Sequence, residues 1–150
     1  MPIISIEGPS APTIRRIAEI ITSEGGRAYL VGGWVRDRII NPEQDPEDAD
    51  IEVFGIAPEK LREVLTKNFK CNLYGKSFQI IGLSEHNIDV AIPRRELKTG
   101  SGHTDFDVQG DPEMSLSEAA ARRDFTVNSI YARIPDGLIE DPFDGMVDLR

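Results

Sequence analysis

The stretch from Asp48 to Phe54 constrains the fold most, because acidic and apolar side chains alternate along it. In a β-strand, side chains two residues apart point to the same face. Asp48, Asp50 and Glu52 therefore share one face, and the apolar side chains between them point the other way. The pattern predicts a strand with one face in a core and one acidic face.

The acidic face predicts a site for a divalent cation. Two ionised carboxylates on one face repel each other, which costs stability. A divalent cation removes that repulsion and takes the oxygens as ligands, and Mg²⁺ held in this way serves phosphoryl transfer. We expect Asp48 and Asp50 to hold Mg²⁺. The alternative is a solvated edge strand, because Asp-x-Asp is a common sequence.

A second strand, Asn87 to Ile92, carries another candidate carboxylate. Its alternation places Ile88 and Val90 on one face and Asp89 on the other. If this strand neighbours the first, Asp89 becomes a third carboxylate at the cation site. Otherwise Asp89 is a surface aspartate.

The segment from Leu30 to Asp37 combines an apolar strand, a Gly-Gly turn and a helix start. Gly32 and Gly33 allow backbone N–H groups to approach a phosphate, and a helix N-terminus favours negative charge. The spacing matches neither a Walker loop nor a dinucleotide-binding motif. Arg36 or Arg38 is in reach of such a phosphate. The alternatives are a plain tight turn and, for Arg36, a structural ion pair with a nearby carboxylate.

Periodicity and turn residues predict the remaining elements. Helices are expected between Ser10 and Gly25, over 34–40, from Pro58 onward and over 115–121. Strands are expected over 28–31, 50–54, 78–83, 87–92, 129–134 and 138–140, with a hairpin link at 84–86. The Gly- and Asp-rich segment 98–112 is expected to be a mobile loop. The result is an α/β sandwich of modest size.

Composition excludes several classes of protein. The chain has 17 Lys and Arg against 26 Asp and Glu, a net charge of −9, which disfavours autonomous binding of tRNA or DNA. Cys71 is the single cysteine, so an internal disulfide and a Cys-rich zinc site are excluded. His86 and His103 lack metal-ligand spacing. The sequence shows neither a spanning apolar run nor a secretory signal, so we expect a cytoplasmic protein without a membrane partner.

Four segments, in this order, carry a family resemblance: 32–37, 48–51, 122–128 and 141–149. Together they resemble the head domain of bacterial-type tRNA nucleotidyltransferases, which comprise the class II CCA-adding enzymes and the bacterial poly(A) polymerases. These belong to the DNA polymerase beta-like nucleotidyltransferase superfamily. The resemblance implies an α/β (α+β) nucleotidyltransferase fold, with a mixed, mainly antiparallel sheet of about five strands flanked by helices.

The resemblance also implies roles for individual residues. Asp48 and Asp50 match the metal-binding aspartates, and Asp89 falls where the superfamily has a third carboxylate of variable role. The residues matching the triphosphate-binding turn are Gly32, Gly33 and Arg36. The residues matching the segment that contacts the sugar and phosphates of the incoming nucleotide are Arg122, Arg123, Asp124 and Asn128. For the last group the alternative is a charge cluster at a helix end.

The activity implied is template-independent transfer of a nucleotide from ATP or CTP to the 3′-hydroxyl of an RNA, most directly CCA addition to tRNA, with Mg²⁺ and release of pyrophosphate. Residues 1–150 correspond to the head alone. The neck, body and tail domains, which select the base and bind tRNA, are not expected within them. The oligomeric state is open.

Two alternatives to that activity remain. One is a head that binds nucleotide without turnover. The other is a nucleotidyltransferase that acts on an acceptor other than tRNA. Trp34, at a position that is usually small, and a slightly long segment before Asp48 depart from the family pattern.

Overall fold

The computed structural model describes residues 3–43, 46, 48–74, 80–84, 87–98, 106–110, 113–121 and 129–148. The helices are α1 (Ala11–Ser23), α2 (Gly33–Ile40), α3 (Pro58–Asn68), α4 (Leu116–Ala121) and α5 (Gly145–Asp148). The strands are β1 (Arg27–Val31), β2 (Ala49–Phe54), β3 (Cys71–Tyr74), β4 (Ile80–Leu83), β5 (Ile88–Ala91), β6 (Arg94–Lys98), β7 (Phe106–Gly110), β8 (Tyr131–Arg133) and β9 (Ile139–Glu140). In the part of the chain described, no helix combines the length and the apolar character that crossing a membrane requires.

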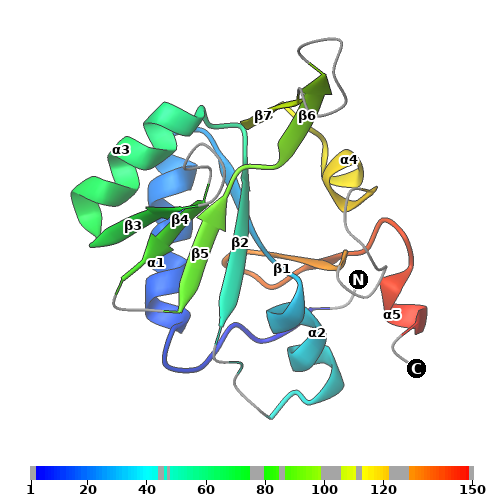
Figure 1. Ribbon diagram of the computed structural model, residues 1–150. Coiled ribbons are helices and arrows are strands. Elements are labelled where there is room, and N and C mark those ends of the chain that lie inside the picture. Colours follow the sequence, from blue (N-terminus) through cyan, green and yellow to red (C-terminus); the bar gives the residue numbers. More distant parts are fainter. Residues whose placement is uncertain are drawn as a thin grey trace.

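Seven strands form one sheet in the order β3-β4-β5-β2-β1-β8-β9 (Figure 1). Among the described pairs only β2 and β5 run parallel, so the expected mixed, mainly antiparallel sheet is confirmed. The expected number of strands was too low. The short β3, which lies at the edge beside β4, was not predicted because its four residues are too few to establish an alternating pattern.

One face of the sheet is covered by α1 and α3. Helix α1 buries Ile14, Ile17 and Ile21 at helical spacing, as the sequence predicted, and α3 adds Leu61 and Leu65. These side chains pack in one apolar cluster with the alternate residues of the central strands. Burying this much aliphatic surface supplies the main driving force for folding.

The opposite face is only partly covered. A second apolar cluster joins Tyr29, Phe54 and Tyr131 of the strands to Ala119 and Ala120 of α4. Helix α4 begins where Ser115 was expected to start it, because Ser115 and Glu118 form a capping box: the Glu118 N–H donates to Ser115 Oγ over 3.1 Å. Farther from this cluster the same face carries Asp50 and Asp89 beside the apolar Ile80 and Ala91.

The segment 98–112 was expected to be a mobile loop, and that expectation was wrong for part of it. Residues 106–110 form β7, which pairs antiparallel with β6 in a separate two-stranded sheet. This hairpin projects from the main sheet (Figure 1). The hairpin expected between the strands predicted at 78–83 and 87–92 is supported by the antiparallel pairing of β4 with β5, and residues 85–86 of its link lie outside the described residues. Backbone pairing with β6 holds β7 extended although the surrounding segment is rich in turn-forming residues.

Candidate functional site

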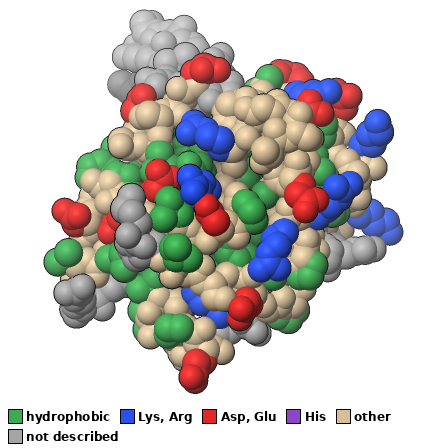
Figure 2. All heavy atoms as spheres, turned by 180° about the vertical axis from the view of Figure 1, so that it is seen from behind, with side chains coloured by type: hydrophobic (Ala, Val, Ile, Leu, Met, Phe, Trp, Pro, Cys, Tyr) green, Lys and Arg blue, Asp and Glu red, His purple; other side chains and the backbone are tan. Residues whose placement is uncertain are grey.

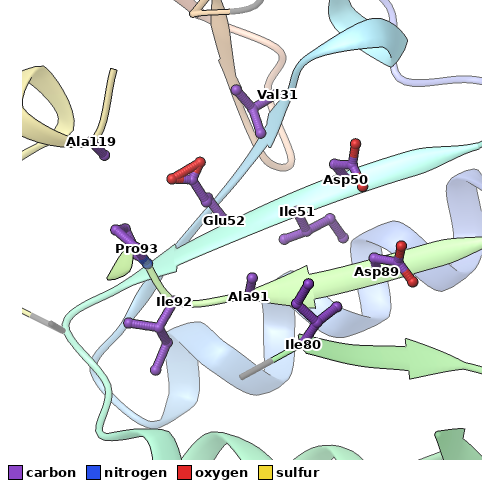
Figure 3. Close-up of a pocket in the computed structure, with 10 residues that line it drawn as sticks. All are labelled: Val31, Asp50, Ile51, Glu52, Ile80, Asp89, Ala91, Ile92, Pro93 and Ala119. Carbon is purple, nitrogen blue, oxygen red and sulfur yellow. The ribbon is translucent and has the colours of Figure 1, made fainter. Parts of the chain in front are cut away.

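Asp50 of β2 and Asp89 of β5 lie directly opposite each other in the parallel pair. Neighbouring strands are about 4.8 Å apart, so the two carboxylates start from adjacent backbone positions. Figure 3 shows both side chains rising from the same face of the sheet. Asp50 is exposed and Asp89 half-buried. Strand β2 lies between β5 and β1, so the alternative of a solvated edge strand was wrong.

Asp48, immediately before β2, lies near this pair. It lines a hollow of about 510 Å³ together with Asp50 and Asp89. We call this the outer hollow, and its polar wall also includes Asn72, Gly82, Ser84 and Asn87. The structure therefore brings all three carboxylates that the sequence singled out to one depression.

A second depression, the inner cavity, lies farther along β2 and also contains Asp50 and Asp89. Its volume is about 320 Å³, and its wall is completed by Val31, Glu52, Ile80, Ala91, Ile92, Pro93 and Ala119. Figure 3 shows Glu52 pointing from β2 toward the α4 residue Ala119. The inner cavity thus has an acidic end and a largely apolar wall.

Glu52 is buried, with 8% of its surface exposed, and Tyr131 binds it. The Tyr131 hydroxyl donates to the carboxylate, 3.1 Å from Oε2 and 3.3 Å from Oε1. Burying a carboxylate is costly unless it is hydrogen-bonded, and a charge-assisted bond of this kind reduces that cost. The sequence placed Glu52 on the acidic face, but nothing local pointed to its partner 79 residues away.

An aromatic cluster supports Tyr131. The ring of Tyr29 meets those of Phe54 and Tyr131 edge to face, with centroids 5.5 and 6.0 Å apart. Burial raises the pKa of the Tyr29 phenol, and a hydrogen bond and repulsion from the Glu140 carboxylate raise it further. Tyr29 therefore stays a neutral member of the cluster at physiological pH.

The Gly-Gly turn joins β1 to α2, and β1 lies on the opposite side of β2 from β5 and Asp89. Gly32 has φ 73° and ψ −140°, a conformation that favours glycine. A Cβ on Gly33 would lie 3.3 Å from Nη2 of Arg36, so the guanidinium folds back over the first turn of α2. Arg36 also forms an ion pair with Asp37 over 3.1 Å. An ion pair with a nearby carboxylate was the alternative to phosphate binding that the sequence left open for Arg36.

Arg38 does not face a phosphate site. It is 2% exposed and donates to the backbone oxygens of Pro42 and Glu7 over 3.0 and 2.9 Å. Its guanidinium lies 5.0 Å from the ring centroid of Trp34, which is itself buried. Arg38 and Trp34 thus have a structural role: they hold the chain that leads from α2 toward Asp48.

The segment containing Arg122, Arg123, Asp124 and Asn128 lies outside the described residues. Its two flanks meet, because Ser129 Oγ donates to the Ala120 oxygen over 3.1 Å. The described ends of this segment therefore lie beside the inner cavity, which Ala119 lines.

The acidic residues are better suited to Mg²⁺ than to a metal ion that takes all its ligands from protein side chains. Within the described ranges, no three His, Cys, Asp or Glu side chains form a group that could hold a metal ion by themselves. Mg²⁺ usually binds through one or two carboxylates and keeps waters or substrate phosphates as its other ligands. One or two carboxylates, such as those of Asp48 and Asp50 at the outer hollow, suit that mode of binding.

Charge on the reverse side of the molecule is mixed. Figure 2 shows Lys and Arg side chains interspersed with Asp and Glu over the described residues visible there, without a continuous basic field. A surface that holds RNA alone normally shows such a field. This view agrees with the excess of acidic residues in the sequence.

Comparison with known proteins identifies the family. A family model described as "Poly A polymerase head domain" matches residues 28–150. The multifunctional CCA protein of Alkalilimnicola ehrlichii is 37% identical over 124 residues, which cover 83% of this chain and 28% of that protein. The chain spans less than a third of the length of the curated relatives it matches.

Solved structures agree. The CCA-adding enzyme of Bacillus stearothermophilus in complex with CTP superimposes with a TM-score of 0.69 at 25% identity, over 96% of this chain and 32% of that one. A tRNA nucleotidyltransferase complexed with a primer tRNA and an incoming ATP analog gives 0.63 at 27% identity, over 89% and 36%. The chain belongs to the poly A polymerase head domain family.

Proposed function

We propose that this chain is the catalytic head of an enzyme that transfers a nucleotide from ATP or CTP to the 3′-hydroxyl of tRNA, completing its CCA end. The observation that carries this proposal is the register of Asp50 with Asp89, beside Asp48 and across from the Gly32 turn. Support comes from the relatives, which are CCA proteins, and from the solved complexes with CTP, with an ATP analog and with primer tRNA.

Asp48 and Asp50 would hold Mg²⁺, with Asp89 as a neighbouring carboxylate. When bound, the cation supplies neutralisation of the triphosphate and lowers the pKa of the attacking hydroxyl. Asp89, half-buried beside Asp50, would accept a hydrogen bond from that hydroxyl. The 3′-hydroxyl would lose its proton to solvent, the new bond would join its oxygen to the α-phosphorus, and the bond from that phosphorus to pyrophosphate would break.

The Gly-Gly turn and Arg36 would receive the phosphates. The first backbone N–H groups of a helix have no partner within it, so those at the start of α2 would donate to a phosphate, which the helix dipole also favours. The ion pair between Arg36 and Asp37 is solvent-exposed, and such pairs contribute only about 0–1 kcal/mol. Arg36 can therefore exchange Asp37 for a phosphate oxygen at little cost. The segment 122–128 would complete the contacts to sugar and phosphates.

Thermal unfolding with ligands tests the proposal. Wild type and Asp48→Asn/Asp50→Asn are melted with and without Mg²⁺ and CTP or ATP. A ligand at about 100 times its Kd stabilises the native state by roughly 2.7 kcal/mol. We expect wild type to shift only with metal and nucleotide together, and the double variant not to shift. Glu19→Gln/Glu63→Gln, which removes two exposed carboxylates from α1 and α3, is the matched control and should behave as wild type.

Transfer of labelled CTP or ATP to RNA separates the alternatives. Product that requires Mg²⁺ and a free 3′-hydroxyl supports the proposal. A thermal shift without product on any RNA would instead indicate a nucleotide-binding head without turnover. A shift that survives in Asp48→Asn/Asp50→Asn would show that the acidic residues do not hold the cation.

A further inference from the structure

Helix α2 carries the Gly-Gly turn at its N-terminus and leads toward Asp48 at its C-terminus, so its position decides how far the turn lies from the acidic site. The helix has eight residues, and its buried side chains are those of Trp34, Val35 and Arg38. A helix this short depends on packing for its stability, so these three side chains hold it on the sheet. Two of them form one stacked pair, with the Arg38 guanidinium 5.0 Å from the Trp34 ring centroid.

Arg38 is a costly residue for the inner side of a helix. It is 2% exposed, and a buried charge lowers stability unless it is well hydrogen-bonded. Apolar side chains of similar volume often serve a core as well or better. Buried charged groups that persist can instead specify one arrangement of the chain. The contacts of Arg38 therefore indicate which arrangement it specifies.

The Arg38 guanidinium joins segments that are distant in the sequence. Nη2 donates to the Glu7 backbone oxygen over 2.9 Å, and Nη1 donates to the Pro42 backbone oxygen over 3.0 Å, just past the end of α2. The planar fork of arginine holds two acceptors in fixed relative directions, which a lysine ammonium does not. Arg38 thus ties α2 to the N-terminal arm, residues 3–9, and sets the direction in which the chain leaves the helix.

The N-terminal arm is a fixed support for this contact. The Ile4 N–H donates to the Gly137 oxygen over 3.0 Å, in the turn between β8 and β9. Arg15 of α1 donates to the Ile6 oxygen. The arm is therefore held at the sheet and at α1 before it reaches Arg38, and it can keep α2 in place.

The link from α2 to β2, residues 41–48, is held near both of its ends. Arg38 binds it at Pro42, and directly after it the Ala49 N–H donates to the Asn87 oxygen of the neighbouring strand region over 2.8 Å. Residues 41–43 and Asp48 are exposed, so burial does not fix these parts of the link. Hydrogen bonds near its ends therefore contribute strongly to the position of Asp48.

Both departures of this chain from the family pattern meet at Arg38. Trp34, at the position that is usually small, covers the guanidinium, and the guanidinium binds the first part of the segment that is longer than usual. A longer segment between fixed ends loses more conformational entropy when it is ordered. The contact at Pro42 reduces the length that remains free.

We propose that Arg38, held by Trp34, is a positioning residue for nucleotide binding: it sets the distance between the Gly32 turn, which would receive the phosphates, and Asp48, which would hold Mg²⁺. This inference rests on the proposed function and adds a residue that touches neither ligand. A triphosphate that carries Mg²⁺ contacts the turn and the carboxylate at once, so its affinity depends on that distance.

Calorimetric titration of the intact chain with CTP in the presence of Mg²⁺ tests the inference. Arg38→Lys should raise the Kd of CTP about tenfold, as found for residues that orient metal ligands without touching the metal. The amide NMR signals of Gly33 and Asp48 should also move in the ligand-free variant. A Kd within about twofold of wild type overturns the inference. Absence of CTP binding by wild type would instead overturn the proposed function, on which the inference rests.

Two control variants separate positioning from general stability. Arg15→Lys loosens the same arm at Ile6 without touching the link, and Leu65→Ala destabilises the core from α3, on the other face of the sheet. Both should bind CTP with the wild-type Kd. An increase in either control as large as that in Arg38→Lys would show that CTP affinity follows stability alone, and the inference would be wrong.

Chemical rescue provides a second test that does not depend on a lysine. Arg38→Ala leaves space beside Trp34, and added methylguanidinium can donate there to the Glu7 and Pro42 oxygens. Methylguanidinium should restore most of the CTP affinity lost in Arg38→Ala. Methylammonium, which carries the same charge without the fork, should not. Equal effects of the two salts on the Kd of CTP would contradict a role for the fork.

Discussion

The Tyr131 hydroxyl of β8 reaches across β1 to the Glu52 carboxylate of β2, at 3.1 and 3.3 Å from its two oxygens. One hydrogen-bonded pair therefore links the strand that carries Asp50 to the strand that follows the 122–128 segment. Both residues are buried, so the link lies in a region of low dielectric, where hydrogen bonds are stronger.

Replacing Tyr131 with Phe should lower the free energy of unfolding by about 2 kcal/mol, because a hydrogen bond to a charged group is lost while the ring is kept. Urea denaturation measures this change. Glu52→Gln keeps an oxygen that accepts from Tyr131, and it should cost less than half as much. A Tyr131→Phe loss below about 0.5 kcal/mol would show that the pair contributes little.

Replacing Asp89 with Asn should stabilise the chain when divalent cations are removed. Like charges on directly opposite strand residues are destabilising by roughly 0.2–1 kcal/mol, and Asp89 faces Asp50 in this way. Thermal melts in a chelator measure the gain, and Mg²⁺ should then stabilise the variant less than wild type. Asp136→Asn, which breaks the ion pair to Arg133, should show no gain. A less stable Asp89→Asn would contradict the predicted repulsion.

Replacing Gly33 with Ala should separate stability from binding. The added Cβ would lie 3.3 Å from Arg36 Nη2, the movable end of a long side chain, so the fold has room to adjust. Ala in a helix is favoured over Gly by roughly 0.5–1 kcal/mol, so the melting temperature should stay constant or rise. Displacing the guanidinium should nevertheless weaken CTP binding about fivefold, as for one lost hydrogen bond. Calorimetric titration that finds unchanged affinity would remove Arg36 from the phosphate site.

Replacing Gly137 with Ala should be strongly destabilising. The φ of Gly137 is +74°, and a Cβ there would lie 2.0 Å from the backbone oxygen of Ile4. The backbone N–H of Ile4 also donates to the Gly137 oxygen, which holds the two segments together. Gly25→Ala is the matched control, since φ is +86° there but nothing lies within 4 Å of the added carbon. We expect about 1 kcal/mol for Gly25→Ala from backbone conformation alone and at least about 3 kcal/mol for Gly137→Ala. Equal losses in urea titrations would show that the backbone at Ile4 moves away from the added carbon without cost in stability.

The acidic site was predictable because its signal is local. The alternation at 48–54 placed two aspartates on one face, and the same rule placed Asp89 on the polar face of its own strand. No local pattern indicated that these two strands would be neighbours. The sequence therefore predicted Asp89 at the cation site only on the condition that they were. The same limit explains why Tyr131 was missed: its contact with Glu52 depends on the order β2-β1-β8.

Elements with weak patterns were also missed. Strand β3 has only four residues, too few to establish an alternating pattern, and β7 lies in a segment rich in turn-forming residues. Both are held by pairing to a partner strand. The sequence could not show that Arg38, unlike Arg36, has a structural role. That role depends on its contacts with Trp34 and with the backbone oxygen of the distant Glu7.

The single parallel pair among the described strands has a consequence for folding kinetics. Asp50 and Asp89 are 39 positions apart (89 − 50), and a helix and two strands intervene before β5 comes to lie beside β2. Contacts of such sequence separation form only after loop-closure entropy has been overcome. The carboxylate pair therefore does not exist in a partly folded chain, and Mg²⁺ would bind only after the strand crossover is complete. A cation that binds at this point slows unfolding more than it accelerates refolding.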